Sequence, residues 1–201
     1  MTEKTVLVVG CGGLGGYVIE ELARLGVKHL VLFDGDTFCE SNMNRQLESG
    51  LDTLGKKKAL AYKERLERKF DASVTAVDSF LTEDNAGIAS EVDLVMDCVD
   101  NVKTRLFLED ICEKYGKILV HGGLEGSFGQ VCLCYPGEKT LRKLYVDRTE
   151  KKHLTNAYTV ATVASMQVSL AQKVLTGQAA PLKGKMFLVD MESLAIDEVS
   201  V

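Results

Sequence analysis

The chain has 201 residues, of which 46% are hydrophobic, so it is long enough to bury one sizeable core. Its 24 basic and 29 acidic residues are mixed along the chain and give a formal net charge of −5. Sequence-independent binding of nucleic acid depends on neutralising phosphates, so this balance argues against a nucleic-acid partner. No apolar run approaches the roughly 20 residues of a membrane-spanning helix. No cleavable signal precedes the first strand, so we expect a cytoplasmic protein.

Short apolar runs alternate with amphipathic stretches over the first 121 residues. The predicted strands are Thr5–Val9, Lys28–Phe33, Ser73–Val77, Asp93–Asp97 and Lys117–His121. The predicted helices are Gly13–Leu25, Gly55–Phe70, Thr82–Ser90 and Val102–Tyr115. Strands that alternate with helices are typical of a parallel sheet with right-handed crossover connections.

The remainder of the chain has a different order. Gly129–Tyr135, Lys185–Met191 and Ser193–Val199 indicate strands, the last two as a hairpin, and Tyr158–Thr176 indicates one long helix after a polar loop. We therefore expect an α/β fold, a Rossmann-like doubly wound parallel sheet extended by antiparallel strands. Because there is no internal repeat and no linker, residues 1–201 are expected to form a single domain.

The most informative motif follows the first strand directly and reads G-C-G-G-L-G over residues 10–15. Glycines in such a turn let the backbone approach a nucleotide, and the helix that follows presents free N–H groups to the phosphates. The motif fits NAD, FAD and adenine-nucleotide sites equally. The residues of this turn that we expect to bind the nucleotide are Gly10, Gly12, Gly13, Leu14 and Gly15.

Charged residues after the second strand favour a triphosphate over an intact dinucleotide. Asp34 lies 19 residues beyond Gly15 and closes the second strand, the position from which an acid binds ribose hydroxyls. The polar segment Ser41–Gln46 contains Arg45, and Gly55–Lys58 places lysines at the start of the next helix. Cations directed at phosphates indicate a reaction in which charge develops on an attacked phosphorus.

The fourth strand ends in D-C-V-D-N over residues 97–101, and Arg105 follows one turn into the next helix. A carboxylate at the carboxyl end of a parallel strand lies in the ligand crevice. Mg²⁺ binds one or two such carboxylates together with phosphate oxygens. Asp100 is therefore the expected metal ligand, whereas Asp97 is expected to be structural. For His121, a structural role and a ligand-facing role both stay open.

Together these motifs resemble the HesA/MoeB/ThiF family of the ubiquitin-activating superfamily, whose members adenylylate sulfur-carrier proteins. The resemblance covers nearly the whole chain, in order and with matching spacing. The matching pieces are G-C-G-G-L-G at 10–15, D-G-D at 34–36, S-N-M-N-R-Q at 41–46, G-K-K-K at 55–58, D-C-V-D-N at 97–101, G-Q-V at 129–131 and Y-P-G at 135–137.

The resemblance implies a role for each expected site residue. Asp34 would bind the ribose, and Asp100 would hold Mg²⁺. The residues expected in the nucleotide site beside the phosphates are Asn42, Arg45, Gln46 and Lys58. Of these, Arg45 and Lys58 would act in catalysis together with Asp100.

The activity that the resemblance implies is ATP-dependent adenylylation of a ubiquitin-like sulfur carrier. The C-terminal glycine carboxylate of a carrier ending in Gly-Gly would be the acceptor, and pyrophosphate would be released. ATP and Mg²⁺ would be required, a homodimer is the implied assembly, and thiamine or molybdenum-cofactor biosynthesis is the implied pathway.

Three departures from the family pattern modify this expectation. Only Met1–Lys4 precedes the first strand, so the arginine that reaches from one subunit into the partner's site has no counterpart. The first zinc-binding C-x-x-C pair of many members falls on Thr140 and Lys143 and the second is missing, so no zinc is expected. No cysteine lies near Leu154–Asn156, where members form a thioester or persulfide, so the reaction would stop at the acyl-adenylate.

Three other functions stay open on the sequence. A tRNA threonylcarbamoyladenosine dehydratase also lacks a catalytic cysteine, and residues 77–82 resemble that branch of the fold. An NAD-dependent oxidoreductase would use the same glycine turn. A non-catalytic nucleotide-binding partner would match the short N-terminal segment.

Overall fold

Eight strands form one mixed sheet in the computed structural model, which describes residues 1–146 and 155–201. The strand order is β3-β2-β1-β4-β5-β6-β7-β8, with parallel pairing from β3 to β5 and antiparallel pairing from β5 to β8. The strands are β1 (Thr5–Val9), β2 (His29–Phe33), β3 (Ser73–Val77), β4 (Leu94–Asp97), β5 (Leu119–Glu125), β6 (Phe128–Cys134), β7 (Lys185–Asp190) and β8 (Ala195–Ser200). The predicted fold class, a doubly wound parallel sheet extended by antiparallel strands, is confirmed.

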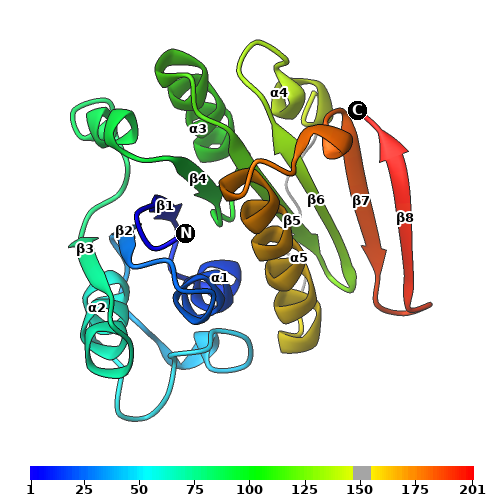
Figure 1. The fold of residues 1–201 in the computed structure, drawn as a ribbon. Helices are drawn as coiled ribbons and strands as arrows, with labels where there is room; N and C mark the ends of the chain where they lie inside the picture. The colour runs from blue at the N-terminus through cyan, green and yellow to red at the C-terminus, as the bar shows by residue number, and fades with distance from the viewer. Residues whose placement is uncertain (147–154) are drawn as a thin grey trace.

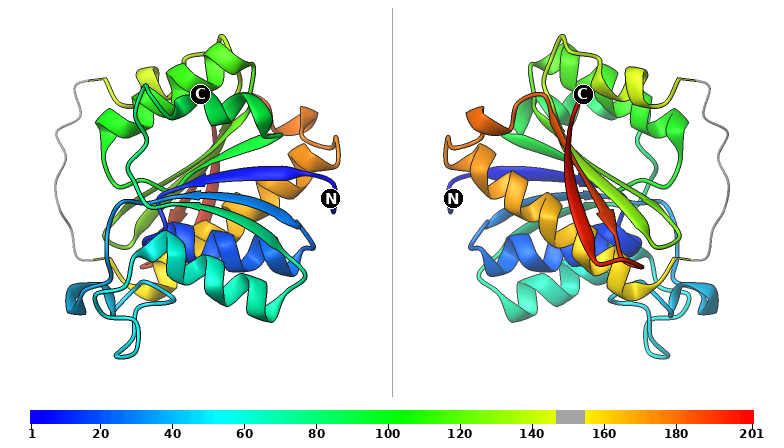
Figure 2. Two further views of the ribbon diagram at one scale, coloured as in Figure 1. Left: turned by 90° about the vertical axis from the view of Figure 1, so that its left-hand side faces the viewer. Right: turned by 90° about the vertical axis from the view of Figure 1, so that its right-hand side faces the viewer.

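Helices cover both faces of the sheet (Figure 1). They are α1 (Gly13–Arg24), α2 (Lys58–Lys69), α3 (Val102–Tyr115), α4 (Thr140–Leu144) and α5 (Ala157–Leu175). The side views show α3 and α4 on one face and α1, α2 and α5 on the other (Figure 2). Two buried clusters match these layers, one between the sheet and α1, α2 and α5, the other between the sheet and α3 and α4.

The register of the parallel strands brings distant segments to one edge. Val9 pairs with Phe33 on one side and with Asp97 on the other, and Phe33 pairs with Val77. The turns that follow β1, β2, β3 and β4 therefore share the carboxyl edge of the sheet. In an open α/β sheet this edge is where ligands bind.

Two predicted helices are shorter in the structure. The stretch Thr82–Ser90 forms only a 3₁₀ helix over Ala86–Glu91, and Gly87 and Ser90 in this stretch favour an α-helix weakly. The helix expected from Gly55 begins at Lys58, because Gly55 has a φ of +76° and the backbone before the helix is extended.

Two elements extend beyond the prediction. The polar loop expected before the long helix contains α4, whose first amides are accepted by the carboxylate of Glu109 on α3. Strand β5 continues to Glu125, because its extension pairs with β6 in a hairpin. In the part of the chain that the structure describes, no helix has the length and hydrophobicity needed to cross a membrane.

Candidate functional site

The glycine turn between β1 and α1 is shaped by close packing at two of its positions. A Cβ atom on Gly10, whose φ is +91°, would lie 2.5 Å from the carbonyl oxygen of Cys98. A Cβ atom on Gly15 would lie 1.8 Å from the carbonyl oxygen of Gly10. These two glycines are therefore required for packing the turn, whether or not a ligand binds there.

The other two glycines of the turn face the neighbouring polar segment and α5. A Cβ atom on Gly12 would lie 3.4 Å from Nε2 of Gln46, and one on Gly13 would lie 3.4 Å from Cγ1 of Val160 and 3.9 Å from Cγ of Arg45. Gly12 is the N-cap of α1 and supplies no side-chain hydrogen bond to it. The first amides of α1, together with the helix dipole, therefore form a site that suits an anion.

Asp34 fastens the end of β2 to the glycine turn. Its Oδ2 accepts the amide proton of Cys11 at 2.7 Å, and its Oδ1 accepts that of Asp36 at 2.8 Å. Asp34 therefore braces this loop. Each carboxylate oxygen keeps capacity for a second hydrogen bond, so bracing is compatible with the expected contact to ribose.

The two expected catalytic cations lie close to this turn. Lys58 is the first residue of α2, only 5% exposed, and its Nζ lies 3.2 Å from Oδ2 of Asp36. Arg45 donates from Nη1 to the carbonyl oxygen of Ser41 at 2.9 Å and to Oδ1 of Asn44 at 2.7 Å. A buried ammonium is costly unless it is paired, and the ion pair that Lys58 forms within the described part of the chain is to an exposed carboxylate.

The side-chain amides of Asn42 and Gln46, both in the polar segment Ser41–Gln46, differ in their hydrogen bonding. Oδ1 of Asn42 accepts the amide proton of Cys39 at 3.1 Å and so closes the 3₁₀ turn over Glu40–Asn42. Gln46 is also buried, but its Oε1 has no hydrogen-bond partner among the described residues. A buried oxygen without a partner costs stability, so this atom is a strong candidate for contact with a ligand or a bound water.

Asp100 lies on the turn after β4 and is exposed. Its neighbour Asn101 caps α3 by accepting the amide proton of Thr104 at 2.9 Å and lies 3.4 Å from the Asp100 carboxylate. The free carboxylate suits Mg²⁺, which needs one or two such ligands when phosphate oxygens complete its shell. Among the described residues no group of three or more His, Cys, Asp or Glu side chains could hold a metal by itself.

A buried ionic group lies directly behind this turn. Nδ1 of His121 is 2.6 Å from Oδ2 of Asp97, and Nη1 of Arg105 is 3.3 Å from the same oxygen. Burial raises the pKa of the Asp97 carboxyl, but Arg105 and His121 outweigh burial and lower it, so Asp97 is ionised. Burial lowers the pKa of His121, which keeps the imidazole neutral at physiological pH.

The buried ionic group answers the question left open for His121, which is fully buried in the protein and does not face the crevice. Its Nε2 lies 3.1 Å from Nε2 of Gln130 on β6 and 3.2 Å from the hydroxyl of Tyr145, just after α4. The sequence pattern did not predict this group. The available signal was the register, since Asp97 ends β4 and pairs directly with His121 of the adjacent parallel strand β5.

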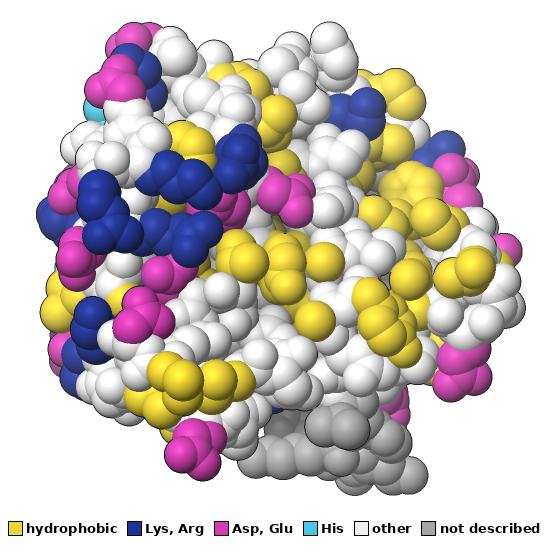
Figure 3. Space-filling view, turned by 90° about the horizontal axis from the view of Figure 1, so that it is seen from below, with side chains coloured by type: hydrophobic (Ala, Val, Ile, Leu, Met, Phe, Trp, Pro, Cys, Tyr) yellow, Lys and Arg dark blue, Asp and Glu magenta, His cyan; other side chains and the backbone are white. Residues whose placement is uncertain are grey.

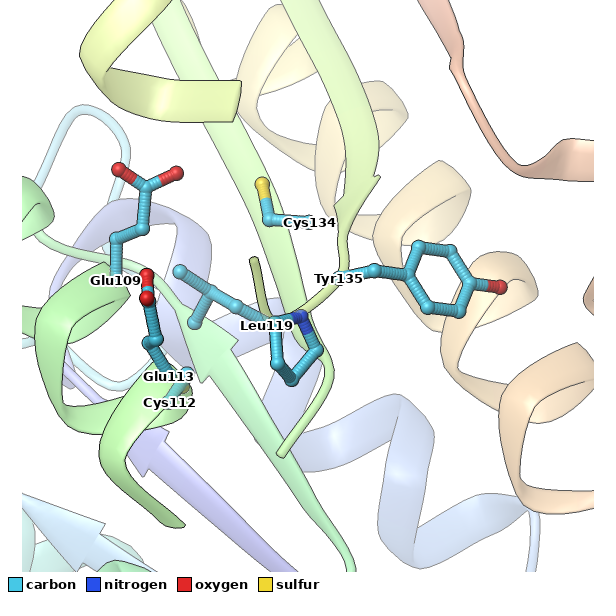
Figure 4. Close-up of a pocket in the computed structure, with 7 residues that line it drawn as sticks. Glu109, Cys112, Glu113, Leu119, Cys134 and Tyr135 are labelled. Atoms are coloured by element: carbon cyan, nitrogen blue, oxygen red, sulfur yellow. The ribbon is translucent and has the colours of Figure 1, made fainter. Parts of the chain in front are cut away.

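A small hollow lies on the face of the sheet that α3 and α4 cover, and it does not resemble a ligand site. Glu109, Cys112, Glu113 and Cys134 line it, together with Leu119 and the Tyr135–Pro136 turn (Figure 4). The Glu109 carboxylate already accepts two amides of α4, and burial raises the pKa of the Cys112 thiol to about 12. Neither group is free or reactive, so we assign this hollow a structural role.

Basic side chains gather on part of the face that α1, α2 and α5 cover (Figure 3). On α1 and α2, the carboxylate of Glu20 is bound by Arg24, Arg65 and Lys69. These cations neutralise a carboxylate of the protein itself, so the group is not a free anion-binding surface.

Thr140, Lys143 and the segment Leu154–Asn156 stand at the positions of the missing zinc and thioester cysteines. Thr140 is buried in the first turn of α4, whereas Lys143 is exposed on the same helix. Of the segment Leu154–Asn156, Leu154 lies outside the described residues. The carbonyl oxygen of Thr155 accepts from Nδ2 of Asn44 at 3.3 Å, which places the start of α5 beside the polar segment.

Comparison with known proteins identifies relatives over the full length. The model of the ThiF family matches residues 1–201. The chain is 31% identical to the SAMP-activating enzyme E1 of Haloferax volcanii, over 99% of this chain and 77% of that protein. It is 30% identical to the molybdopterin-synthase adenylyltransferase of Escherichia coli, over 100% and 84%.

In two further similarities, the aligned region covers a smaller share of the other protein. A tRNA threonylcarbamoyladenosine dehydratase of Haemophilus influenzae is 35% identical, over 63% of this chain and 50% of that protein. Among solved structures, E. coli MccB with ATP is similar with a TM-score of 0.81 and 20% identity, over 99% of this chain. The chain spans 63% of that MccB chain, and at this identity the likeness shows the fold alone.

Proposed function

This chain belongs to the ThiF family, and from that membership we propose that it is an ATP-dependent adenylyltransferase for a ubiquitin-like sulfur carrier. Relatives aligned over nearly the whole chain include a SAMP-activating enzyme and a molybdopterin-synthase adenylyltransferase, which supports this reaction class. We take residues 1–201 as one adenylylating domain.

One observation carries the proposal: two cations lie beside an uncapped helix N-terminus at the carboxyl edge of the sheet. Arg45 packs next to Gly13, and the buried Lys58 is joined to the same edge through Asp36. A hydride-transfer site does not need them, whereas attack on a phosphorus develops charge that they would neutralise. Asp34, Asn42, Gln46 and the glycine turn complete the proposed nucleotide site.

In the proposed reaction, a carboxylate oxygen of the carrier's terminal glycine attacks the α-phosphorus of ATP. The new oxygen–phosphorus bond forms as the bond to the bridging oxygen of pyrophosphate breaks, and the electron pair leaves with pyrophosphate. The carboxylate is already ionised at neutral pH, so the protein needs no general base. The residues act by positioning and by charge neutralisation. Mg²⁺, held by Asp100, would neutralise charge on the phosphates.

Several finer features belong to the proposal. The carrier ends in Gly-Gly, the assembly is a homodimer, and no zinc is bound. The product is the acyl-adenylate, made for thiamine or molybdenum-cofactor biosynthesis. Light scattering tests the assembly, where a particle of twice the 22.0 kDa chain mass is expected. Elemental analysis tests the zinc prediction, which one tightly held zinc per chain would contradict.

The activity is tested by ATP–pyrophosphate exchange. We expect exchange that requires Mg²⁺ and a carrier ending in Gly-Gly, and none with the same carrier shortened by those two glycines. Thermal melts should show stabilisation by ATP with Mg²⁺, about 2.7 kcal/mol at 100 times its Kd. Stabilisation by NAD alone would reject the adenylyltransferase.

A second function is favoured by one relative, the tRNA threonylcarbamoyladenosine dehydratase. It would activate a carboxylate on a modified nucleoside with ATP. ATP binding without exchange on any Gly-Gly carrier, together with ATP cleavage that depends on modified tRNA, would select it.

A further inference from the structure

The turn that carries Asp100 is held by hydrogen bonds to both backbone groups of one residue, Val99. The amide nitrogen of Val99 donates to Oδ1 of Asp97 at 3.2 Å, and its carbonyl oxygen accepts from Nη2 of Arg105 at 2.7 Å. Val99 immediately precedes Asp100, so these two hydrogen bonds orient the backbone from which the Asp100 side chain extends. The carboxylate itself is exposed, and Nδ2 of Asn101 donates to its Oδ1 at 3.4 Å.

The guanidinium of Arg105 is in turn fixed by several elements. Besides Asp97, its Nη1 donates to the carbonyl oxygen of Gly122 on β5 at 2.6 Å and lies 3.1 Å from Nδ1 of His121. The guanidinium carbon lies 5.6 Å from the centre of the Tyr145 ring. Arg105 is 7% exposed, so its guanidinium is buried behind the crevice and does not reach into it.

This arrangement depends on the shape of the guanidinium and not on its charge alone. A planar fork donates from two nitrogens in fixed directions, which lets Arg105 pair with Asp97 through Nη1 while Nη2 holds Val99. A lysine ammonium at this position could keep the ion pair but has one nitrogen. It could not hold Val99 and Gly122 from two nitrogens at fixed angles.

We propose that Arg105 is a positioning residue, which fixes the peptide of Val99 and thereby sets the Asp100 carboxylate for its metal. The inference rests on the proposed function, because that function makes Asp100 the magnesium ligand. Replacing a residue that orients a metal ligand typically changes the metal affinity about 10- to 100-fold, and we expect about tenfold for a conservative change.

The test measures metal binding, not turnover. Mn²⁺ replaces Mg²⁺, and its binding in the presence of α,β-methylene ATP is followed by electron paramagnetic resonance for wild type, Arg105→Lys, Asp100→Ala and the double variant. Arg68→Lys, an exposed arginine on α2, is the matched control. We expect Arg105→Lys to weaken Mn²⁺ binding about tenfold, and to have no further effect once Asp100 is alanine.

The double variant separates positioning from folding. If Arg105→Lys weakens Mn²⁺ binding equally with and without Asp100, or in neither background, the inference is wrong. Where Arg105→Lys folds poorly, Tyr145→Leu removes the ring beside the guanidinium and keeps the Asp97 pair. It should weaken Mn²⁺ binding in the same Asp100-dependent way, and equal binding to wild type would overturn the inference.

The proposed function and the positioning role of Arg105 can be rejected independently of each other. Tight Mn²⁺ binding by Asp100→Ala would remove the metal assignment of Asp100 and the inference with it, while carrier-dependent exchange would still stand. Absence of exchange in wild type, with Arg105 still acting only through Asp100 on Mn²⁺ binding, would reject the carrier and keep the positioning role.

Discussion

The carboxylate of Asp34 lies 2.7 Å from the amide nitrogen of Cys11, and this hydrogen bond ties the end of β2 to the glycine turn. Cys11 is fully buried, so its N–H has no access to water if the carboxylate is removed. The same carboxylate accepts the amide of Asp36. The residue expected to bind ribose therefore also supports the fold.

Asp34→Ala should lower the free energy of unfolding even without nucleotide. A buried N–H that loses its partner costs about 1–3 kcal/mol, and we expect a loss of that size in urea unfolding. Asp52→Ala, at an exposed carboxylate, is the control and should change little. Equal stability of Asp34→Ala and wild type would contradict the bracing role.

Gln46→Met should weaken the binding of ATP without lowering the stability of the ligand-free protein. It removes the buried Oε1 that lacks a partner among the described residues while roughly conserving volume. We expect the stability without ligand to be unchanged or higher, because the cost of an unsatisfied oxygen is lost. The extra stability that ATP with Mg²⁺ provides should fall, as measured by thermal melts.

The control for that variant is Gln172→Met on the exposed side of α5. It should leave both the stability and the response to ATP as in wild type. A Gln46→Met protein that is much less stable without ligand, yet responds fully to ATP, would show that this amide serves only the fold.

Stability should decline on mild acidification because of His121. Burial lowers its pKa in the folded protein, so the unfolded chain, with a histidine pKa near 6.5, binds more protons below that pH. The contribution is present above about pH 6.5 and is lost as pH falls towards the folded pKa, with a slope of at most about 1.4 kcal/mol per pH unit for one proton. Asp97, whose folded pKa is also lowered, adds a loss only below about pH 4.

Urea unfolding between pH 7 and pH 5 measures this effect. His121→Gln should flatten the dependence on pH, whatever it does to the stability at pH 7. His29→Gln, at an exposed residue of β2, should keep the wild-type slope. An unchanged slope in His121→Gln would assign the acid sensitivity to other groups.

Asp100→Ala should impair the reaction far more than the fold. The side chain is exposed and β4 packs without it, so the melting temperature should stay close to that of wild type. Loss of one such electrostatic contact typically lowers the rate by about 10²–10³. ATP–pyrophosphate exchange at matched melting temperature is the measurement, with Asp84→Ala as the exposed-carboxylate control. Unchanged exchange in Asp100→Ala would reject its role.

The sequence pattern predicts the parallel half of the fold and the edge at which the site lies. Each apolar run from β1 to β4 is followed by a turn and a stretch with helical spacing, and that local periodicity needs no distant contact to be recognised. Because parallel strands end at a common edge, residues 10–15, Asp34 and Asp100 could be placed together from their positions in the chain. Their proposed roles remain predictions.

Which polar groups satisfy one another depends on contacts that form only in the folded protein. Asp97 and His121 are 24 residues apart and meet because β4 and β5 pair in one particular register. The helix α4 exists where a loop was expected because Glu109, over 30 residues earlier, accepts its first amides. Local propensity carries no information about such partners, since burying a polar group is favourable only once a distant group has arrived to pair with it.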